Sequence, residues 1–191
     1  AKPLFDELSY EYSSRYGAQH GLNHPENKEH QRYPPILFQP PRGAFVLLLR
    51  NGVPIAGGAF MPIDERTAEM KRIWTHSDFR RQGLSTRVLR ELEEEAARRG
   101  YTRIYLTTGN RQPEARNLYL KNGYTPLFEV EADPETLGLL PFEKVIEPAL
   151  SPARRVSLSA WWLRRKQQKA IERAWTLRNP IPRRLDDLVA G

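Results

Sequence analysis

Six residues, Arg80-Arg81-Gln82-Gly83-Leu84-Ser85, join an apolar strand-like segment to a long amphipathic helix-like segment. A turn that leads directly into a helix gathers several backbone N–H groups at the positive end of the helix dipole, which suits a phosphate or pyrophosphate. Gly83 allows close approach of the backbone to the anion, and Arg80 and Arg81 add positive charge. The sequence therefore predicts an anion-binding turn at residues 80–85.

A second segment could contribute to catalysis. It reads Asn110-Arg-Gln-Pro-Glu-Ala-Arg-Asn-Leu-Tyr-Leu-Lys-Asn-Gly-Tyr124. Pro113 suits the first turn of a helix, and this helix carries Tyr119 and ends at Asn122-Gly123. An anion-binding turn followed by a helix that carries tyrosine indicates an enzyme that holds a phosphorylated carrier.

Together the two segments resemble the GCN5-related N-acetyltransferase (GNAT) family. Its phosphate loop reads Arg or Gln, two residues, Gly, one residue, Gly or Ala, and here Ser85 takes the last position. The preceding Val-x-Pro of the family is Thr75-His76-Ser77, and its Leu-Tyr-x-Lys-x-Gly-Phe/Tyr motif is residues 118–124. The resemblance extends from about Phe45 to Ile146.

The resemblance implies an α/β fold with a mixed, mostly antiparallel sheet flanked by helices. It also implies an enzyme that transfers an acetyl group from acetyl-CoA to an amine by direct attack in a ternary complex, with a small molecule or a peptide as the acceptor. Strand residues 73–75 would pair with the pantetheine arm, and a backbone N–H there would face the oxyanion. The residues so assigned to acetyl-CoA are Ile73, Trp74, Thr75, Arg80, Arg81, Gln82, Gly83, Leu84, Ser85 and Asn110.

Two side chains are candidates for proton transfer. Tyr119 matches the tyrosine that protonates the thiolate leaving group in the family; by spacing alone it could instead pack in its helix with Ala115 and Leu118. Glu69 resembles a carboxylate that acts as base, directly or through water. Strand alternation places Glu69, Lys71 and Ile73 on one face, so Glu69 could simply pair with Lys71.

Other polar residues have plainer interpretations. His24, His30 and His76 are alternative bases, and His76 also fits as a turn residue. Asn110 could likewise be a turn residue. His20 and His24 have the spacing of a helical metal pair, but Gly21 and Pro25 disfavour a helix and no third ligand is evident, so we expect no metal site.

Composition separates the chain into two parts, an acetyltransferase domain over 1–150 and a basic helical extension over 151–191. The net charge is +7, and the extension holds ten Lys or Arg against three acidic residues, so it carries the whole surplus. It could bind nucleic acid, an anionic membrane surface or an acidic protein. Alternatively, a stripe with Trp161, Trp162 and Trp175 packs on its own domain or across a homodimer.

Several functional classes are excluded or disfavoured. With no cysteine, disulfides and thiol catalysis are absent. No signal peptide or membrane-spanning run is evident, so we expect a soluble, cytoplasmic protein. Two alternatives to an enzyme stay open: a CoA-binding sensor with little turnover, and a nucleic-acid-associated protein that acts through its tail.

Hydrophobic periodicity and turn residues predict the element order. Gly57-Gly58 within one strand predicts a bulge or a close approach by another group. The expected helices are 3–16, 85–99, one from Pro113, and one from Ser157 or Ser159 to about Arg178. The expected strands are 45–49, 54–61, 67–74, 103–107, 124–130 and 142–146, with a loop at 17–42 and a loop or short turn at 134–140.

Overall fold

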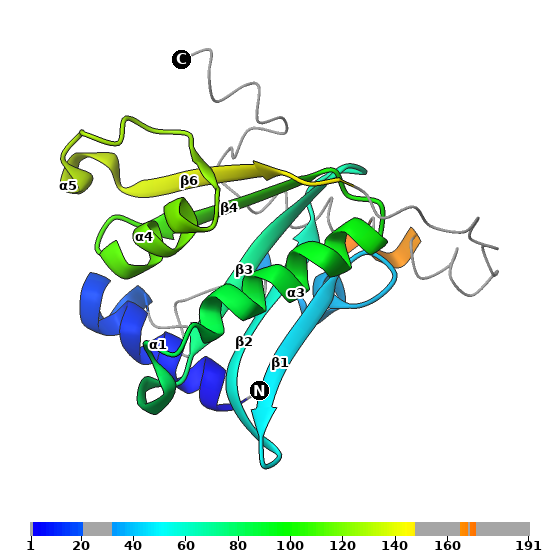
Figure 1. Ribbon diagram of the computed structural model, residues 1–191, viewed down its shortest axis with the longest axis horizontal. Helices are drawn as coiled ribbons and strands as arrows, with labels where there is room; N and C mark the ends of the chain where they lie inside the picture. Colours follow the sequence, from blue (N-terminus) through cyan, green and yellow to red (C-terminus); the bar gives the residue numbers. More distant parts are fainter. Residues whose placement is uncertain (1, 21–31, 148–164, 168, 171–191) are drawn as a thin grey trace.

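The computed structural model describes residues 2–20, 32–147, 165–167 and 169–170, which form an α/β fold (Figure 1). The helices are α1 Lys2–Tyr16, α3 Leu84–Arg98, α4 Pro113–Lys121 and the single turn α5 Pro134–Leu137, with 3-10 turns η1 Ala18–His20, η2 Pro35–Phe38 and η3 Ser77–Phe79. The strands are β1 Ala44–Arg50, β2 Val53–Pro62, β3 Thr67–Thr75, β4 Arg103–Gly109, β5 Thr125–Pro126 and β6 Leu139–Val145.

The sheet has the order β1-β2-β3-β4-β6-β5, and its neighbours are antiparallel except β3 and β4. The parallel pair is short: it runs only from Thr67 opposite Arg103 to Glu69 opposite Tyr105. Beyond these residues the two strands diverge towards their carboxyl ends (Figure 1). The sheet therefore opens at the carboxyl ends of β3 and β4, the position where ligands usually bind in α/β folds.

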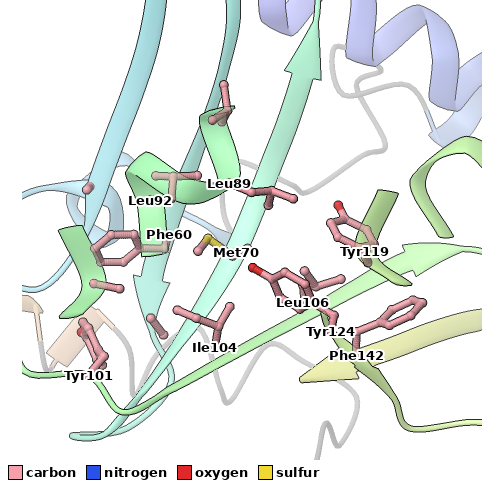
Figure 2. Close-up of a cluster of buried hydrophobic side chains, with 14 of the residues drawn as sticks. Phe60, Met70, Leu89, Leu92, Tyr101, Ile104, Leu106, Tyr119, Tyr124 and Phe142 are labelled. Atoms are coloured by element: carbon pink, nitrogen blue, oxygen red, sulfur yellow. The ribbon is translucent and has the colours of Figure 1, made fainter. Parts of the chain in front are cut away.

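Two layers of side chains cover the sheet. The main core contains Val88, Leu89 and Leu92 of α3 together with Phe60 and Met70, and it continues under α4 (Figure 2). On the opposite face Leu4 and Leu8 of α1 pack on Trp74. A third cluster joins η2 to β2 and consists of Tyr33, Leu37, Phe38, Ala59 and Met61.

The expected mixed, mostly antiparallel fold is confirmed, with two local errors in the strands. The predicted hairpin turn is present, with Asn51 at φ 51° and Gly52 at φ 78°. The strand expected at 124–130 is wrong beyond Pro126, because the chain leaves the sheet and Phe128 packs on Phe142 with ring centroids 5.2 Å apart. The last strand also begins earlier than expected, at Leu139.

A bulge in β3 changes which face its side chains occupy. Arg72 has φ 59°, and the register with β2 shifts opposite Gly58. Lys71 stays on the face that alternation predicts, where it lies over the Tyr33 ring. Ile73 instead lies on the opposite face of the sheet and packs against the main core. A Cβ on Gly58 would lie 2.6 Å from Ile73 Cδ1, so the close approach expected at Gly57-Gly58 is confirmed, whereas the extra residue of the bulge lies in β3 and not in the glycine-containing strand.

Part of the C-terminal extension contacts the domain. Residues 165–167 and 169–170 are helical, and the fully buried Gln167 donates from Nε2 to the carbonyls of Ile36 and Gln39. Ala170 packs on the η2 cluster. The three tryptophans and the predicted ends of this helix lie outside the described residues, as do His24 and His30. None of the helices in the described part is long and apolar enough to cross a membrane.

Candidate active site between the diverging strands

A cleft of about 1000 Å³ lies where β3 and β4 separate. Its walls come from both diverging strands, the turn before α3, helix α4 and the inner side of α1. Because β3 and β4 stop pairing after Glu69 and Tyr105, backbone and side chains from both arms can reach a ligand in it. The cleft brings together most of the residues assigned to acetyl-CoA from sequence; Gln82 and Glu69 do not line it.

The turn at 80–85 has the backbone geometry of an anion site. Arg81 (φ 62°) and Gly83 (φ 74°, ψ 7°) are both left-handed, and no side chain caps the start of α3. The first backbone bond is Arg87 N–H to Gly83 O at 3.1 Å, so the N–H groups of residues 84–86 have no partner within the described chain. A Cβ on Gly83 would meet no atom within 4 Å, which leaves the turn open to the cleft.

Side chains around this turn are already engaged with the protein. The Arg80 guanidinium pairs with Glu11 of α1, and its Nε donates to Thr75 O at 3.4 Å. Ser85 Oγ lies 2.8 Å from Thr75 Oγ1, which ties the first turn of α3 to the end of β3. Arg81 is exposed. The backbone therefore offers the donors without a partner in the described chain at this turn, with Arg81 as the accessible charge beside it.

The edge of β3 offers backbone groups to the cleft. His76 N–H donates to Ile55 O of β2. In the same register Trp74, two residues before His76, lies opposite Gly57. In an antiparallel ladder this alternation directs the backbone of Trp74 to β2 and that of Ile73 and Thr75 away from it. These groups therefore face the gap. The Trp74 side chain packs against α1, where its Nε1 donates to Glu7 at 2.9 Å.

Tyr119 both packs in the core and reaches the cleft. Its side chain is 6% exposed, and its ring lies 5.6 Å from Tyr124 and 5.5 Å from Phe142. Figure 2 shows its hydroxyl directed away from Phe142, and no described residue hydrogen-bonds it. Burial raises the pKa of Tyr119 well above its usual range, so the phenol keeps its proton at neutral pH and remains able to donate a hydrogen bond.

Asn110 lies at the end of β4 and lines the cleft from that arm. Its backbone N–H donates to Gly138 O at 3.0 Å. The neighbouring Gln112 fixes this end of the strand, because its Oε1 accepts from Thr108 Oγ1 at 2.8 Å and from Gly109 N–H at 3.1 Å. Asn110 thus serves as a turn residue through its backbone while its side chain borders the cleft.

Glu69 is held away from the cleft. Its side chain is fully buried, and its Oε1 lies 2.7 Å from Lys71 Nζ. Lys71 itself lines the cleft and lies 4.6 Å above the centroid of the Tyr33 ring. The pairing that alternation suggested is therefore present, and direct contact between Glu69 and a ligand would require Lys71 to move.

The histidines divide between structural and cleft positions. His76 caps η3 by accepting from Asp78 N–H at 3.2 Å and packs on Trp74 and Phe79, as expected of a turn residue. His20 lines the cleft, with its ring 6.2 Å from that of Tyr16. Within the described ranges no group of three His, Cys, Asp or Glu side chains could hold a metal ion.

Helix α1 supplies site residues that the sequence did not reveal. Glu11 forms an ion pair with Arg80, and Arg15 forms one with Glu114 of α4 at 2.5 Å. Tyr16 Oη accepts from Arg111 N–H at 3.1 Å and lies so near Gly109 that a Cβ there would be 1.9 Å away. The apolar spacing of this helix indicated a buried face, but nothing local indicated that it bridges both diverging arms.

Comparison with known proteins identifies this architecture. Residues 5–124 match the acetyltransferase (GNAT) family. The chain belongs to this family. GNAT proteins are acyltransferases that act on amine acceptors, and the confirmed fold and the position of the cleft agree with that membership.

Individual relatives resemble this chain in sequence or in fold. The chain is 35% identical over 93 residues to the uncharacterized N-acetyltransferase YsnE of Bacillus subtilis; the match spans 46% of this chain and 62% of that relative. An acetyltransferase from Streptococcus agalactiae has the same fold, with a TM-score of 0.60 and 19% identity over 76% of this chain and 90% of that one. The PaiA N-acetyltransferase of Thermoplasma acidophilum, solved with coenzyme A, has a TM-score of 0.57 and 14% identity over 76% and 92%.

Proposed function

We propose that this chain transfers an acetyl group from acetyl-CoA to the nitrogen of an amine. The observation that carries the proposal concerns the backbone N–H groups of residues 84–86, which have no partner among the described residues. Residues 84–86 line the same cleft as Tyr119. The coenzyme A bound to the Thermoplasma relative is consistent with a similar ligand here. The cleft volume and the open face of Gly83 fit a pyrophosphate with an extended arm.

Each residue would have a distinct part in the reaction. Acetyl-CoA supplies a thioester carbonyl, which the amine attacks with loss of the C–S bond. The N–H groups at 84–86, with Arg81, would hold the pyrophosphate, and the backbone of Ile73 and Thr75 would align the arm and donate to the oxyanion. Asn110 would contact the arm from β4. The Tyr119 hydroxyl would donate a hydrogen bond to the departing thiolate, and the amine nitrogen would release its proton to solvent in the cleft.

The geometry favours Tyr119 as a hydrogen-bond donor that stabilises the developing thiolate. A phenol with a raised pKa gives up its proton less readily than a thiol, whose reference pKa is about 8.5, so Tyr119 would stabilise the thiolate through a hydrogen bond and keep its proton. For Glu69 we propose a positioning role, in which it orients Lys71, since the buried carboxylate reaches the cleft only through that ammonium.

The direct test is acetyl transfer by the purified full chain. Acetyl-CoA is incubated with a panel of amines, released CoA is followed with a thiol reagent, and the acetylated product is identified by mass spectrometry. Product formation that depends on both substrates supports the proposal. Tight CoA binding without turnover on any amine would favour the sensor interpretation. Salt-sensitive binding of DNA or RNA that requires residues 151–191 would favour a function of the tail.

A further inference from the structure

We propose that Asn122, at the end of α4, is a positioning residue for the bound carrier, and that its side-chain amide orients the Thr86 hydroxyl towards the pyrophosphate of acetyl-CoA. The inference rests on the proposed acetyl transfer and names a residue that acts through the turn before α3, away from the reacting atoms. It follows from the contacts between α3 and α4, from the direction of their hydrogen bonds, and from the position of Thr86 at the cleft.

Asn122 connects the two helices that carry the proposed donors. Its Nδ2 lies 3.3 Å from Thr86 Oγ1 in the first turn of α3, and it also donates to Leu118 O of α4 at 2.8 Å. Thr86 lines the cleft, and its backbone N–H is among those without a partner in the described chain. Tyr119, the proposed donor to the departing thiolate, directly follows Leu118. One amide therefore contacts both the proposed anion site and the helix of Tyr119.

The Leu118 carbonyl decides which way the Asn122 amide points. A carbonyl oxygen only accepts, so the Asn122 group that faces it is the NH2 and not the amide oxygen. The same NH2 faces Thr86 Oγ1, which makes the threonine oxygen the acceptor of that bond. The Thr86 hydroxyl proton is then left for another acceptor, and the described part of the chain supplies none.

The residue that carries this amide is itself held in place. Lys144 of β6 donates from Nζ to Asn122 O at 3.0 Å and to the Glu93 carboxylate of α3 at 2.8 Å. The Glu93 side chain is largely buried, so solvent screens this ion pair less than an exposed one. The amide therefore meets Thr86 at a defined position. A hydroxyl oriented in advance loses less freedom when a ligand binds than one that rotates.

A pyrophosphate is the acceptor that suits this hydroxyl. Its ionised oxygens only accept hydrogen bonds, and bonds to a charged acceptor are stronger than those between neutral groups. Thr86 is the third residue of α3, so its side chain projects from the same first turn as the N–H groups that would hold the anion. The Thr86 hydroxyl would therefore add a side-chain donor to these backbone donors, and Asn122 would set the direction of its proton.

Calorimetric titration with CoA tests the assignment without turnover. Thr86→Val keeps the branched shape and the backbone N–H, and it should weaken CoA binding by about tenfold because a hydrogen bond to a charged group is lost. Asn122→Ala should weaken it by about three- to tenfold. Thr86→Ser, which retains the hydroxyl, should recover most of the loss seen in Thr86→Val. Asn117→Ala, on the exposed side of α4, is the matched control and should bind CoA like the parent.

A double variant shows whether Asn122 acts through Thr86. If the amide orients that hydroxyl, Asn122→Ala has little further effect once the hydroxyl is gone. Asn122→Ala combined with Thr86→Val should therefore bind CoA within about twofold of Thr86→Val alone. Losses that multiply in the double variant, or parental CoA affinity in Asn122→Ala, would overturn the inference.

The choice of acetyl donor separates positioning from a general structural defect. S-Acetylpantetheine carries the thioester and the arm but no pyrophosphate, so it cannot use the Thr86 hydroxyl in this way. Asn122→Ala should lower kcat/KM for acetyl-CoA by about three- to tenfold and leave kcat/KM for S-acetylpantetheine near the parental value. Equal losses with both donors would show that Asn122 supports α4 as a whole, and would overturn the inference.

The outcomes also distinguish this inference from the proposed function. Acetyl transfer from acetyl-CoA that no Asn122 or Thr86 variant alters would overturn the positioning role and leave the acetyltransferase function standing. Losses of CoA affinity that do not multiply in the double variant, with no turnover on any amine, would support the positioning role and contradict the proposed function alone.

Discussion

Glu11 of α1 holds the guanidinium of Arg80, 69 positions away, at the turn that would receive a pyrophosphate. The carboxylate is only 20% exposed, so its negative charge acts close to the proposed anion site. Arg80 is therefore shared between the protein and any phosphate that enters the cleft. This pair would link the position of α1 to the proposed binding of CoA.

Glu11→Gln should tighten CoA binding by about two- to fivefold at low salt, because the substitution removes a negative charge beside the pyrophosphate and releases Arg80. The gain should shrink as ionic strength rises. Calorimetric titration at two salt concentrations measures both effects. Asp6→Asn, at an exposed carboxylate of the same helix that pairs with Lys2, is the control. Weaker binding in Glu11→Gln would mean that Glu11 orients Arg80 instead of competing for it.

Tyr119→Phe should lower kcat by about 10²-fold or more, since only the hydroxyl that faces the cleft is lost. CoA affinity should stay within about twofold, because the ring packing on Phe142 is kept. Steady-state kinetics with the best acceptor, together with calorimetry, separates the two quantities. Tyr124→Phe is the matched control, since its hydroxyl bonds Glu93 at 2.8 Å. Parental turnover in Tyr119→Phe across pH would assign Tyr119 to packing alone.

Stability should fall at alkaline pH. Burial raises the pKa of Tyr101, of Tyr119 and of Tyr124, and the Glu93 carboxylate adds to the rise at Tyr124. Above pH about 10 the unfolded chain releases these protons and the folded chain keeps them, so folding is disfavoured as pH rises. Each tyrosine contributes a slope of about −1.4 kcal/mol per pH unit in that window.

Urea unfolding between pH 8 and 11 measures this slope. The free energy of unfolding should be nearly flat to pH about 9.5 and then decline. Tyr124→Phe should make the decline shallower by one proton equivalent, while it lowers stability at pH 8 by about 1 kcal/mol through loss of the bond to Glu93. A decline of parental steepness in Tyr124→Phe would show that Tyr124 titrates alike in both states.

Gln167→Leu should destabilise the protein by about 1–3 kcal/mol, because the carbonyls of Ile36 and Gln39 lose their buried donor. For a chain of this size the melting temperature should fall by several degrees. Lys169→Gln, exposed on the same helical segment, is the control. Removal of residues 151–191 should have a larger effect on melting or change the oligomeric state. Equal melting temperatures for the truncated and full chains would refute docking of the extension.

The features predicted well from sequence are those fixed by nearby residues. A helix start after a glycine-containing turn, a hairpin at Asn51-Gly52 and a tyrosine on α4 all follow from local conformational preference and periodicity. The open backbone at Gly83 is of this kind, since a left-handed residue followed at once by a helix leaves the first N–H groups of that helix without a capping side chain.

The features missed depend on contacts between distant segments. The pairing of Glu11 with Arg80 arises only once α1 crosses the diverging strands. The bulge at Arg72 could not be placed, because arginine has no preference for positive φ and the register with β2 decides its position. The position of Lys71 beside the buried Glu69 likewise depends on the segment before η2, where Tyr33 places its ring against the Lys71 ammonium.

Binding of CoA to a Gly83→Val variant tests the central claim most directly. Valine would strain a residue at φ 74° and place a branched side chain where the structure leaves open space at the anion site. Gly100→Val is the matched control, since Gly100 has φ 87° and equally open surroundings but follows the far end of α3. By calorimetry, Gly83→Val should bind CoA at least about 100-fold more weakly, while Gly100→Val binds within about threefold of the parent. A folded Gly83→Val protein with parental affinity for CoA would contradict the assignment of residues 80–85 as the pyrophosphate site.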